Sequence, residues 1–476
     1  FGGTTSYTYN NAGWLTQVTD RFGGATTYQY NAAGQRTQMT APIGMKTLYT
    51  YNNRSFVTAV HNRRSDNAVV ADIDYSYDSA GNRTAIAETI RDVDNQTLHA
   101  ATSNFSYDAL HRLIGEHRTG WNPYRYEYDY DSVGNRLAMR QKDPTTGELQ
   151  GTTNHMYNSM NQMLTAGNIT FTYDAAGNQV TKTVNNVTVT MTWDFRNKMI
   201  AYTDGVTIKY RYDGDGTRVK KVKAGNPSQT TEHYFDRNLG LSQLLFETDG
   251  TDPTVAYTRD AFGLLLSQIR NPESENRVRS VYAFDALGTT RALTNSQEQV
   301  TDTYCYDAWG NAAATQGSTV NAFRYVGMLG YYHDADTGLM LLGARWYDAR
   351  MARFCSLDPI RYGDNWYAYA AGRPTNEIDP SGYAAEHDNK EIIFEFCMTI
   401  CKSLNPMCSC TWWNLPCKWA CNAACNAICK DATDVKIPCK RYGKCLKMEG
   451  VKCQQCCDKQ CGTSALCKDH CYAKCP

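Results

Sequence analysis

The sequence predicts a mainly β protein followed by a small cysteine-rich α-helical domain. The chain has 476 residues, among them 33 Tyr and 35 Gly, a composition that favours strands and turns. A short phrase, an aromatic residue followed by Asp or Asn and often by Gly, recurs as far as Gly310. In contrast, 17 of the 19 Cys fall in the last 93 residues. This abrupt change of composition indicates two different kinds of domain on one chain.

Each copy of the phrase predicts a β-hairpin. Residues 170–173 alternate in polarity like a strand, and residues 187–193 supply the next strand. Between strands, the Asp or Asn bonds its own backbone and the Gly adopts a positive φ. We assign these Asp residues no ligand role. Copies begin at Tyr9, Tyr30, Tyr77, Tyr130, Tyr173, Tyr212, Phe284 and Tyr306.

This pattern resembles the tyrosine–aspartate (YD) repeats of the Rhs family, over residues 1–383. The resemblance implies a spiralling antiparallel β-sheet shell, here residues 1–323, that encloses a C-terminal cargo. Because the chain begins within a repeat, at Phe1, we expect an N-terminal part with the targeting region to lie outside this sequence.

Residues 324–383 resemble the Rhs-associated core. Two Asp-Pro pairs, Asp358-Pro359 and Asp379-Pro380, bracket an Asn-x-Tyr-x-Tyr phrase at residues 365–369. In that family the core is a self-cleaving aspartyl protease. The resemblance therefore implies that Asp358 and Asp379 are catalytic and that the chain is cut between Tyr383 and Ala384. One carboxylate would activate water while its partner donates a proton.

Two arginines, Arg345 and Arg353, are further candidates, to orient a carboxylate or to stabilise an oxyanion. An alternative is that both Asp-Pro pairs only cap turns, since Pro fixes φ and Asp bonds the turn backbone. Acid-labile Asp-Pro bonds would also break the chain, but within these pairs and not after Tyr383.

Residues 384–476 form the expected cargo, and many of their cysteines are spaced by four, which places them on one helical face. We read three or four short helices joined by disulfides, as expected of a small exported domain with a thin core. Thiolates at this spacing also suit zinc or copper(I), which is the alternative. Otherwise we expect no cofactor, and we assign no metal ligand. The disulfide candidates are Cys397, Cys401, Cys417, Cys421, Cys425, Cys429, Cys457, Cys461, Cys467, Cys471 and Cys475.

Other residues of this tail identify no activity. It holds only His387 and His470, too few to indicate a hydrolytic site. Trp412, Trp413 and Trp419 would suit either membrane contact or a small core. The whole chain carries 48 basic and 48 acidic residues, which argues against a nucleic-acid coat.

Together these features predict an Rhs-type polymorphic toxin, in which the shell encapsulates a cysteine-rich effector released by cleavage after Tyr383. The expected partners are the chain's own cargo, a secretion machinery and an immunity protein. The expected location is outside the cell or on its surface after export. The alternative is a non-enzymatic adhesion protein, with the repeats as scaffold and the tail as a disulfide-stapled or metal-thiolate binding module.

Overall fold

The computed structural model describes residues 3–237, 242–361, 363–383 and 386–387. The chain divides into two compact units, the first of residues 1–10 and 14–396, the second of residues 11–13 and 397–476. The account below concerns the first unit. The predicted tail helices and all the disulfide candidates, from Cys397 to Cys475, lie outside the described residues.

One 28-stranded sheet forms most of the first unit. Each strand pairs antiparallel with the next strand along the chain, from β1 to β28. The described residues contain no α-helix, only two short 3-10 turns, η1 (Gly327–Leu329) and η2 (Ala370–Gly372). None of their helices is therefore long and apolar enough to cross a membrane. The predicted antiparallel β architecture is confirmed.

The first fourteen strands are β1 (Ser6–Tyr9), β2 (Leu15–Thr19), β3 (Ala25–Tyr30), β4 (Arg36–Thr40), β5 (Lys46–Tyr51), β6 (Val57–Arg63), β7 (Val69–Tyr77), β8 (Arg83–Arg91), β9 (Leu98–Tyr107), β10 (Leu113–Gly120), β11 (Tyr124–Tyr130), β12 (Arg136–Lys142), β13 (Leu149–Tyr157) and β14 (Met163–Ala166). The next fourteen are β15 (Ile169–Tyr173), β16 (Gln179–Val184), β17 (Val187–Trp193), β18 (Met199–Asp204), β19 (Val206–Tyr212), β20 (Arg218–Lys223), β21 (Gln229–Asp236), β22 (Gln243–Thr248), β23 (Pro253–Arg259), β24 (Leu265–Arg270), β25 (Val278–Phe284), β26 (Thr290–Thr294), β27 (Val300–Tyr306) and β28 (Ala312–Gln316). Two smaller sheets contain β29 (Tyr332–His333), β30 (Met340–Leu342), β31 (Arg345–Asp348) and β32 (Arg353–Phe354), and β33 (Glu377–Ile378) with β34 (Glu386–His387).

The repeat starting at Tyr77 shows how the recurring phrase builds the sheet. Asp78 Oδ1 accepts the backbone N–H of Asn82 at 2.8 Å, and Gly81 has a φ of 95°. These are the turn contacts that the sequence predicts. The Tyr77 hydroxyl donates to the carbonyl oxygen of Val57 at 2.6 Å, at the start of the preceding hairpin's return strand. Each hairpin is thereby tied to the one before it. The same contact joins Tyr30 to Leu15, Tyr51 to Arg36, Tyr130 to Leu113, Tyr157 to Arg136 and Tyr212 to Met199.

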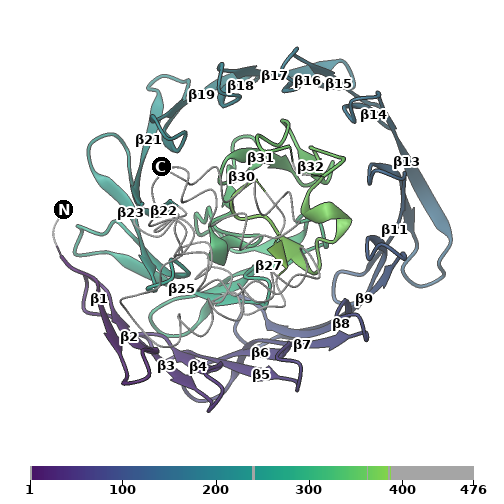
Figure 1. The fold of residues 1–476 in the computed structure, drawn as a ribbon. Coiled ribbons are helices and arrows are strands. Elements are labelled where there is room, and N and C mark those ends of the chain that lie inside the picture. The colour runs from purple at the N-terminus through teal and green to yellow at the C-terminus, as the bar shows by residue number, and fades with distance from the viewer. Residues whose placement is uncertain (1–2, 238–241, 362, 384–385, 388–476) are drawn as a thin grey trace, which may run out of the picture. The chain divides into compact units, whose positions relative to one another are not determined.

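The long sheet curves so that its late strands meet its early ones. In Figure 1 the purple strands β2–β7 lie outside the teal strands β25 and β27. Ion pairs join these two layers: Arg279 contacts Asp20 at 2.6 Å, and Arg36 contacts Asp260 at 3.4 Å. The sheet therefore coils, as the spiral of the resemblance implies.

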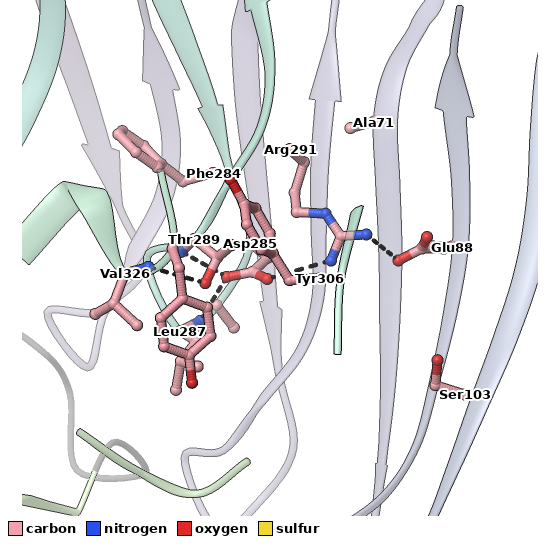
Figure 2. Close-up of polar contacts among 12 residues, drawn as sticks. Ala71, Glu88, Ser103, Phe284, Asp285, Leu287, Thr289, Arg291, Tyr306 and Val326 are labelled. Carbon is pink, nitrogen blue, oxygen red and sulfur yellow. Dashed lines mark hydrogen bonds and ion pairs between the residues drawn. The ribbon is translucent and has the colours of Figure 1, made fainter. Parts of the chain in front are cut away.

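Arg291 on β26 makes a further contact between the two layers, which Figure 2 draws. Its guanidinium lies between Glu88 of β8 at 2.5 Å and Asp285 at 3.5 Å. Glu88 also accepts Arg118 at 2.5 Å. Glu88, Arg118 and Arg291 are buried, and the Asp285 side chain is only 10% exposed. Buried charges must be paired, so this network fixes how the two layers are aligned.

Residues 324–383 pack against the inner face of the sheet, where Figure 1 shows β30–β32 in green. Tyr347, Phe354 and Tyr369 are buried in one hydrophobic cluster with Trp309 from the large sheet. Lys182 of β16 pairs with Asp348 at 2.6 Å. This segment is thereby fixed to the wall of the sheet.

Candidate functional site

The second Asp-Pro pair lies where β33 ends, and its aspartate side chain is almost completely buried. Asp379 is 1% exposed. Its Oδ2 accepts Arg345 Nη2 at 3.0 Å, and its Oδ1 accepts the backbone N–H of Tyr383 at 3.0 Å. The Ser381 hydroxyl donates to the same Oδ1 at 3.2 Å. The chain therefore folds back so that Asp379 holds the residue at which cleavage is predicted.

Arg345 connects the two predicted catalytic aspartates. Its Nη2 contacts Asp379, and its Nη1 donates to the Trp366 carbonyl oxygen at 3.1 Å. The backbone N–H of Asp358 donates to that same carbonyl at 2.9 Å. Arg345 is 3% exposed, and burial lowers its pKa, although the negative charges of Asp379 and Asp358 act to raise that pKa. Both aspartates thus lie in the electrostatic field of one buried guanidinium.

Burial also raises the pKa of Asp379, although Arg345 and the hydrogen bonds from Ser381 and Tyr383 act in the opposite direction. A carboxyl group with a raised pKa keeps its proton to a higher pH, which suits a general acid. Asp358 is also buried, and its Oδ1 accepts the backbone N–H of Ile360 at 3.0 Å. This second contact is that of an Asp-Pro turn cap, the alternative that the sequence leaves open.

The segment before the predicted cut, residues 381–382, is hydrogen-bonded to residues 344 and 345. The Ala344 N–H donates to the Ser381 carbonyl at 2.9 Å, and Arg345 Nε donates to the Gly382 carbonyl. Gly343 has a φ of 49° and Gly382 a φ of 68°. A Cβ at Gly343 would overlap the Ser381 carbonyl oxygen, and a Cβ at Gly382 would overlap the Leu342 carbonyl oxygen. Only glycine fits at such positions.

A cavity of about 300 Å³ lies beside this segment, lined by residues that include Ser381 and Tyr383. Polar groups line part of it, and it is large enough for water. The scissile bond joins Tyr383 to Ala384, and Ala384 lies outside the described residues.

A model of the teneurin YD-shell family matches residues 64–376, more than half of the chain. The chain belongs to the teneurin YD-shell family. N-terminal to this match, a model of the RHS repeat matches residues 9–42. The resemblance to YD-repeat proteins that the sequence indicates is therefore confirmed.

Two relatives of this YD shell carry toxin or nuclease names. The tRNA3(Ser)-specific nuclease WapA of Bacillus spizizenii is 32% identical over 292 residues, which cover 58% of this chain and 12% of WapA. Toxin protein Tse5 of Pseudomonas aeruginosa is 25% identical over 294 residues, 60% of this chain and 19% of Tse5. The chain thus spans only a small part of the length of these relatives.

The fold is shared with a solved complex. The crystal structure of TcdB2-TccC3 without its hypervariable C-terminal region aligns with a TM-score of 0.66 and 23% identity, covering 80% of this chain and 20% of that one. The shell-like β architecture of the YD shell is thereby supported independently of its sequence.

Arg353, the other predicted arginine, makes its contacts elsewhere in the YD shell. Its Nη2 donates to the Asn161 carbonyl at 2.5 Å, and its guanidinium lies over the rings of Tyr157 and Tyr367. These contacts fasten the core segment to the sheet. The catalytic role of Arg353 stays a prediction.

Sequence reasoning missed the group that positions the Asp379 backbone. The Tyr331 hydroxyl accepts the Asp379 N–H at 2.7 Å and lies 3.0 Å from the Tyr369 hydroxyl. Both tyrosines are buried. Tyr331 belongs to no repeat phrase, so no sequence signal distinguishes it from the packing tyrosines of the YD shell.

The two cysteines of the YD shell itself, Cys305 and Cys355, are buried and unbonded. Burial raises the pKa of Cys305 to about 11 and raises that of Cys355 further. Thiols of this kind are inert. Among the described residues no group of His, Cys, Asp and Glu could hold a metal ion.

Proposed function

We propose that this chain is the shell-and-release part of a Rhs-type polymorphic toxin. Residues 1–383 would enclose the segment 384–476 and cut it off after Tyr383. The observation that carries the proposal is the convergence of Asp379 and Arg345 on residues 382–383. The toxin and nuclease names of the relatives support it.

In the proposed reaction, water adds to the Tyr383 carbonyl carbon and the bond to the Ala384 nitrogen breaks. One carboxylate takes a proton from the water, while the other carboxyl group gives a proton to the leaving nitrogen. We assign the donor role to Asp379, because burial raises its pKa. Asp358 is then the acceptor. Arg345 positions both, and the neighbouring cavity admits the water.

Intact mass spectrometry of the purified chain tests this cleavage. We expect a fragment that begins at Ala384, and its loss in Asp358→Asn and in Asp379→Asn. Asp143→Asn is the matched control, because Asp143 also precedes a proline but caps a distant turn through the N–H of Thr145 at 2.8 Å. It should cut normally. Normal cutting in either active-site variant would contradict the mechanism, and breaks within Asp-Pro pairs would indicate acid lability.

The activity of the released segment is a separate question. The relatives are named a nuclease (WapA) and a toxin (Tse5), and the TcdB2-TccC3 structure with the same fold was determined without a hypervariable C-terminal region. We infer that the toxic activity lies in 384–476 and that the protein is exported, with secretion components and an immunity protein as partners. The segment would be stapled by disulfides, or alternatively loaded with zinc or copper. The mass of the fragment under non-reducing conditions distinguishes these states.

A further inference from the structure

The cavity beside the predicted cut has a strongly cationic wall. Besides Ser381 and Tyr383, it is lined by Lys198, Arg218 and Arg259. The only carboxylate among its lining residues is Asp215, which is largely exposed and pairs with Arg237 at 3.1 Å. The described wall of the cavity therefore has an excess of positive charge.

Arg259 has a donor group without a partner. It is 5% exposed, and its Nε and Nη1 donate to the carbonyls of Leu244 and Gly263, each at 2.9 Å. Its Nη2 is buried and has no hydrogen-bond partner among the described residues. Burial lowers the pKa of Arg259 to about 10. A buried guanidinium in this condition would gain from an anion that accepts its free donor.

The other two cations are only partly satisfied. Arg218 contacts Asp334 at 3.5 Å, but its buried Nε has no partner within the described part of the chain. Lys198 Nζ donates to the Ala344 carbonyl at 3.1 Å, and burial together with Arg196 lowers its pKa. Ala344 lies in the turn between β30 and β31, and its N–H holds the Ser381 carbonyl, so Lys198 lies beside the cleavage segment.

We propose that this cavity is an anion site that receives the new α-carboxylate of Tyr383 after cleavage. The inference rests on the proposed function. Hydrolysis converts a neutral peptide carbonyl into a carboxylate on Tyr383 and leaves an ammonium group on Ala384. Tyr383 already lines the cavity, and its amide is anchored on Asp379. The cationic wall attracts the carboxylate and repels the ammonium group, so the two ends separate and do not rejoin.

Trimming of the self-cleaved full chain by a carboxypeptidase tests the site. That enzyme removes Tyr383 only when its carboxylate is accessible, and intact mass reports the loss. We expect slow trimming of the wild type, and trimming about tenfold or more faster in Arg259→Gln and in Lys198→Met. Lys198 is only half-buried, so we expect Lys198→Met to fold even if Arg259→Gln does not, and its trimming rate then tests the anion site. Arg140→Gln, whose guanidinium pairs with Asp129 and does not line the cavity, should match the wild type.

The outcomes separate the two proposals. A normal Ala384 fragment with equal trimming rates in all variants would overturn the anion site and leave the cleavage standing. A chain that yields no Ala384 fragment would overturn the proposed function, and this inference with it. Inorganic phosphate, which competes for the same cations, should raise the wild-type trimming rate towards that of the variants. If it does not, the site is not an anion site.

Discussion

Gly382 is the residue at which the approach of the cleavage segment to β30 and β31 is tightest. A Cβ there would overlap the Leu342 carbonyl oxygen and lie 2.9 Å from the Arg345 nitrogen, at a φ of 68°. Gly382→Ala should therefore displace the segment from Arg345 and abolish cleavage. The loss of folding stability should be about 3 kcal/mol, from backbone strain and overpacking together. Intact mass and thermal unfolding measure the two effects.

The control for this variant is Gly338→Ala. Gly338 has nearly the same φ, 70°, but a Cβ there would meet no atom within 4 Å. It should lose only about 1 kcal/mol from the left-handed backbone and should cut normally. Equal effects at both glycines would show that the close approach at Gly382 is unimportant.

The protonation of Asp379 gives cleavage a pH dependence. As the general acid it must carry a proton, and burial raises its pKa above the usual aspartate value. The rate should therefore fall as pH rises through that raised pKa, by about tenfold for each further pH unit. Rates measured by mass on chain freshly made by cell-free synthesis, at a series of pH values, check this. A rate that increases steadily with pH would exclude Asp379 as the acid.

At the scale of the element, the tyrosine of the repeat phrase links hairpins through one hydrogen bond. The Tyr130 hydroxyl donates to the Leu113 carbonyl at 2.7 Å. Tyr130→Phe keeps the ring and removes the donor, so we expect a loss of about 1 kcal/mol in the free energy of unfolding. Denaturant unfolding measures it. Tyr7→Phe is the control, since Tyr7 is 41% exposed, and it should change stability by much less. Equal losses in the two variants would show that the hydrogen bond to Leu113 adds no stability of its own.

The sequence predicts this hairpin well because its signals are local. Asp78 and Gly81 belong to the same turn, and β15 and β17 match the strands expected around residues 170–173 and 187–193. The target of the tyrosine hydroxyl is not predictable in this way, because Val57 lies in the preceding repeat. Where hairpins coil back on each other depends on the accumulated twist of many strands, which no short pattern encodes.

The candidate site is likewise predictable only where its signals are local in the sequence. The Asp-Pro motifs identify Asp358 and Asp379, since both are short phrases in the sequence. The contact between Arg345 and Asp379 depends on packing across residues 34 apart in the chain. Tyr331 carries no motif at all.

At the scale of the whole first unit, the two layers of the coil meet through polar groups as well as through an apolar core. Asp260 and Asp285 occupy the turn position of the repeat phrase, yet Asp260 is fully buried, the Asp285 side chain is only 10% exposed, and burial raises the pKa of both. The half-buried turn aspartates Asp78 and Asp108 instead have lowered pKa values, because their turn hydrogen bonds outweigh the effect of burial. The same local turn thus lies at the surface in one layer and at the contact between the two layers in the other.

The contact between the two layers, here called the seam, should lose stability when one residue of its buried ion pairs is replaced. Arg291→Met leaves Asp285 without its ion pair and Glu88 with Arg118 alone. A broken buried pair costs about 3–5 kcal/mol. We therefore expect β26 to separate from the outer layer at a lower denaturant concentration than in the wild type, which limited proteolysis detects as cutting near β26. Because the penalty comes from the unpaired carboxylates, adding Glu88→Gln should recover part of it.

The matched comparison is a second ion pair across the same seam. Arg21 contacts Glu273 at 2.7 Å, but Glu273 is 54% exposed. Solvent screens such a pair, so Arg21→Met should cost less than about 1 kcal/mol. If both variants open the seam equally, the layers are aligned by their hydrophobic contacts. If only Arg291→Met does, the buried charges determine how firmly the coil stays closed, and therefore how firmly any enclosed segment is retained.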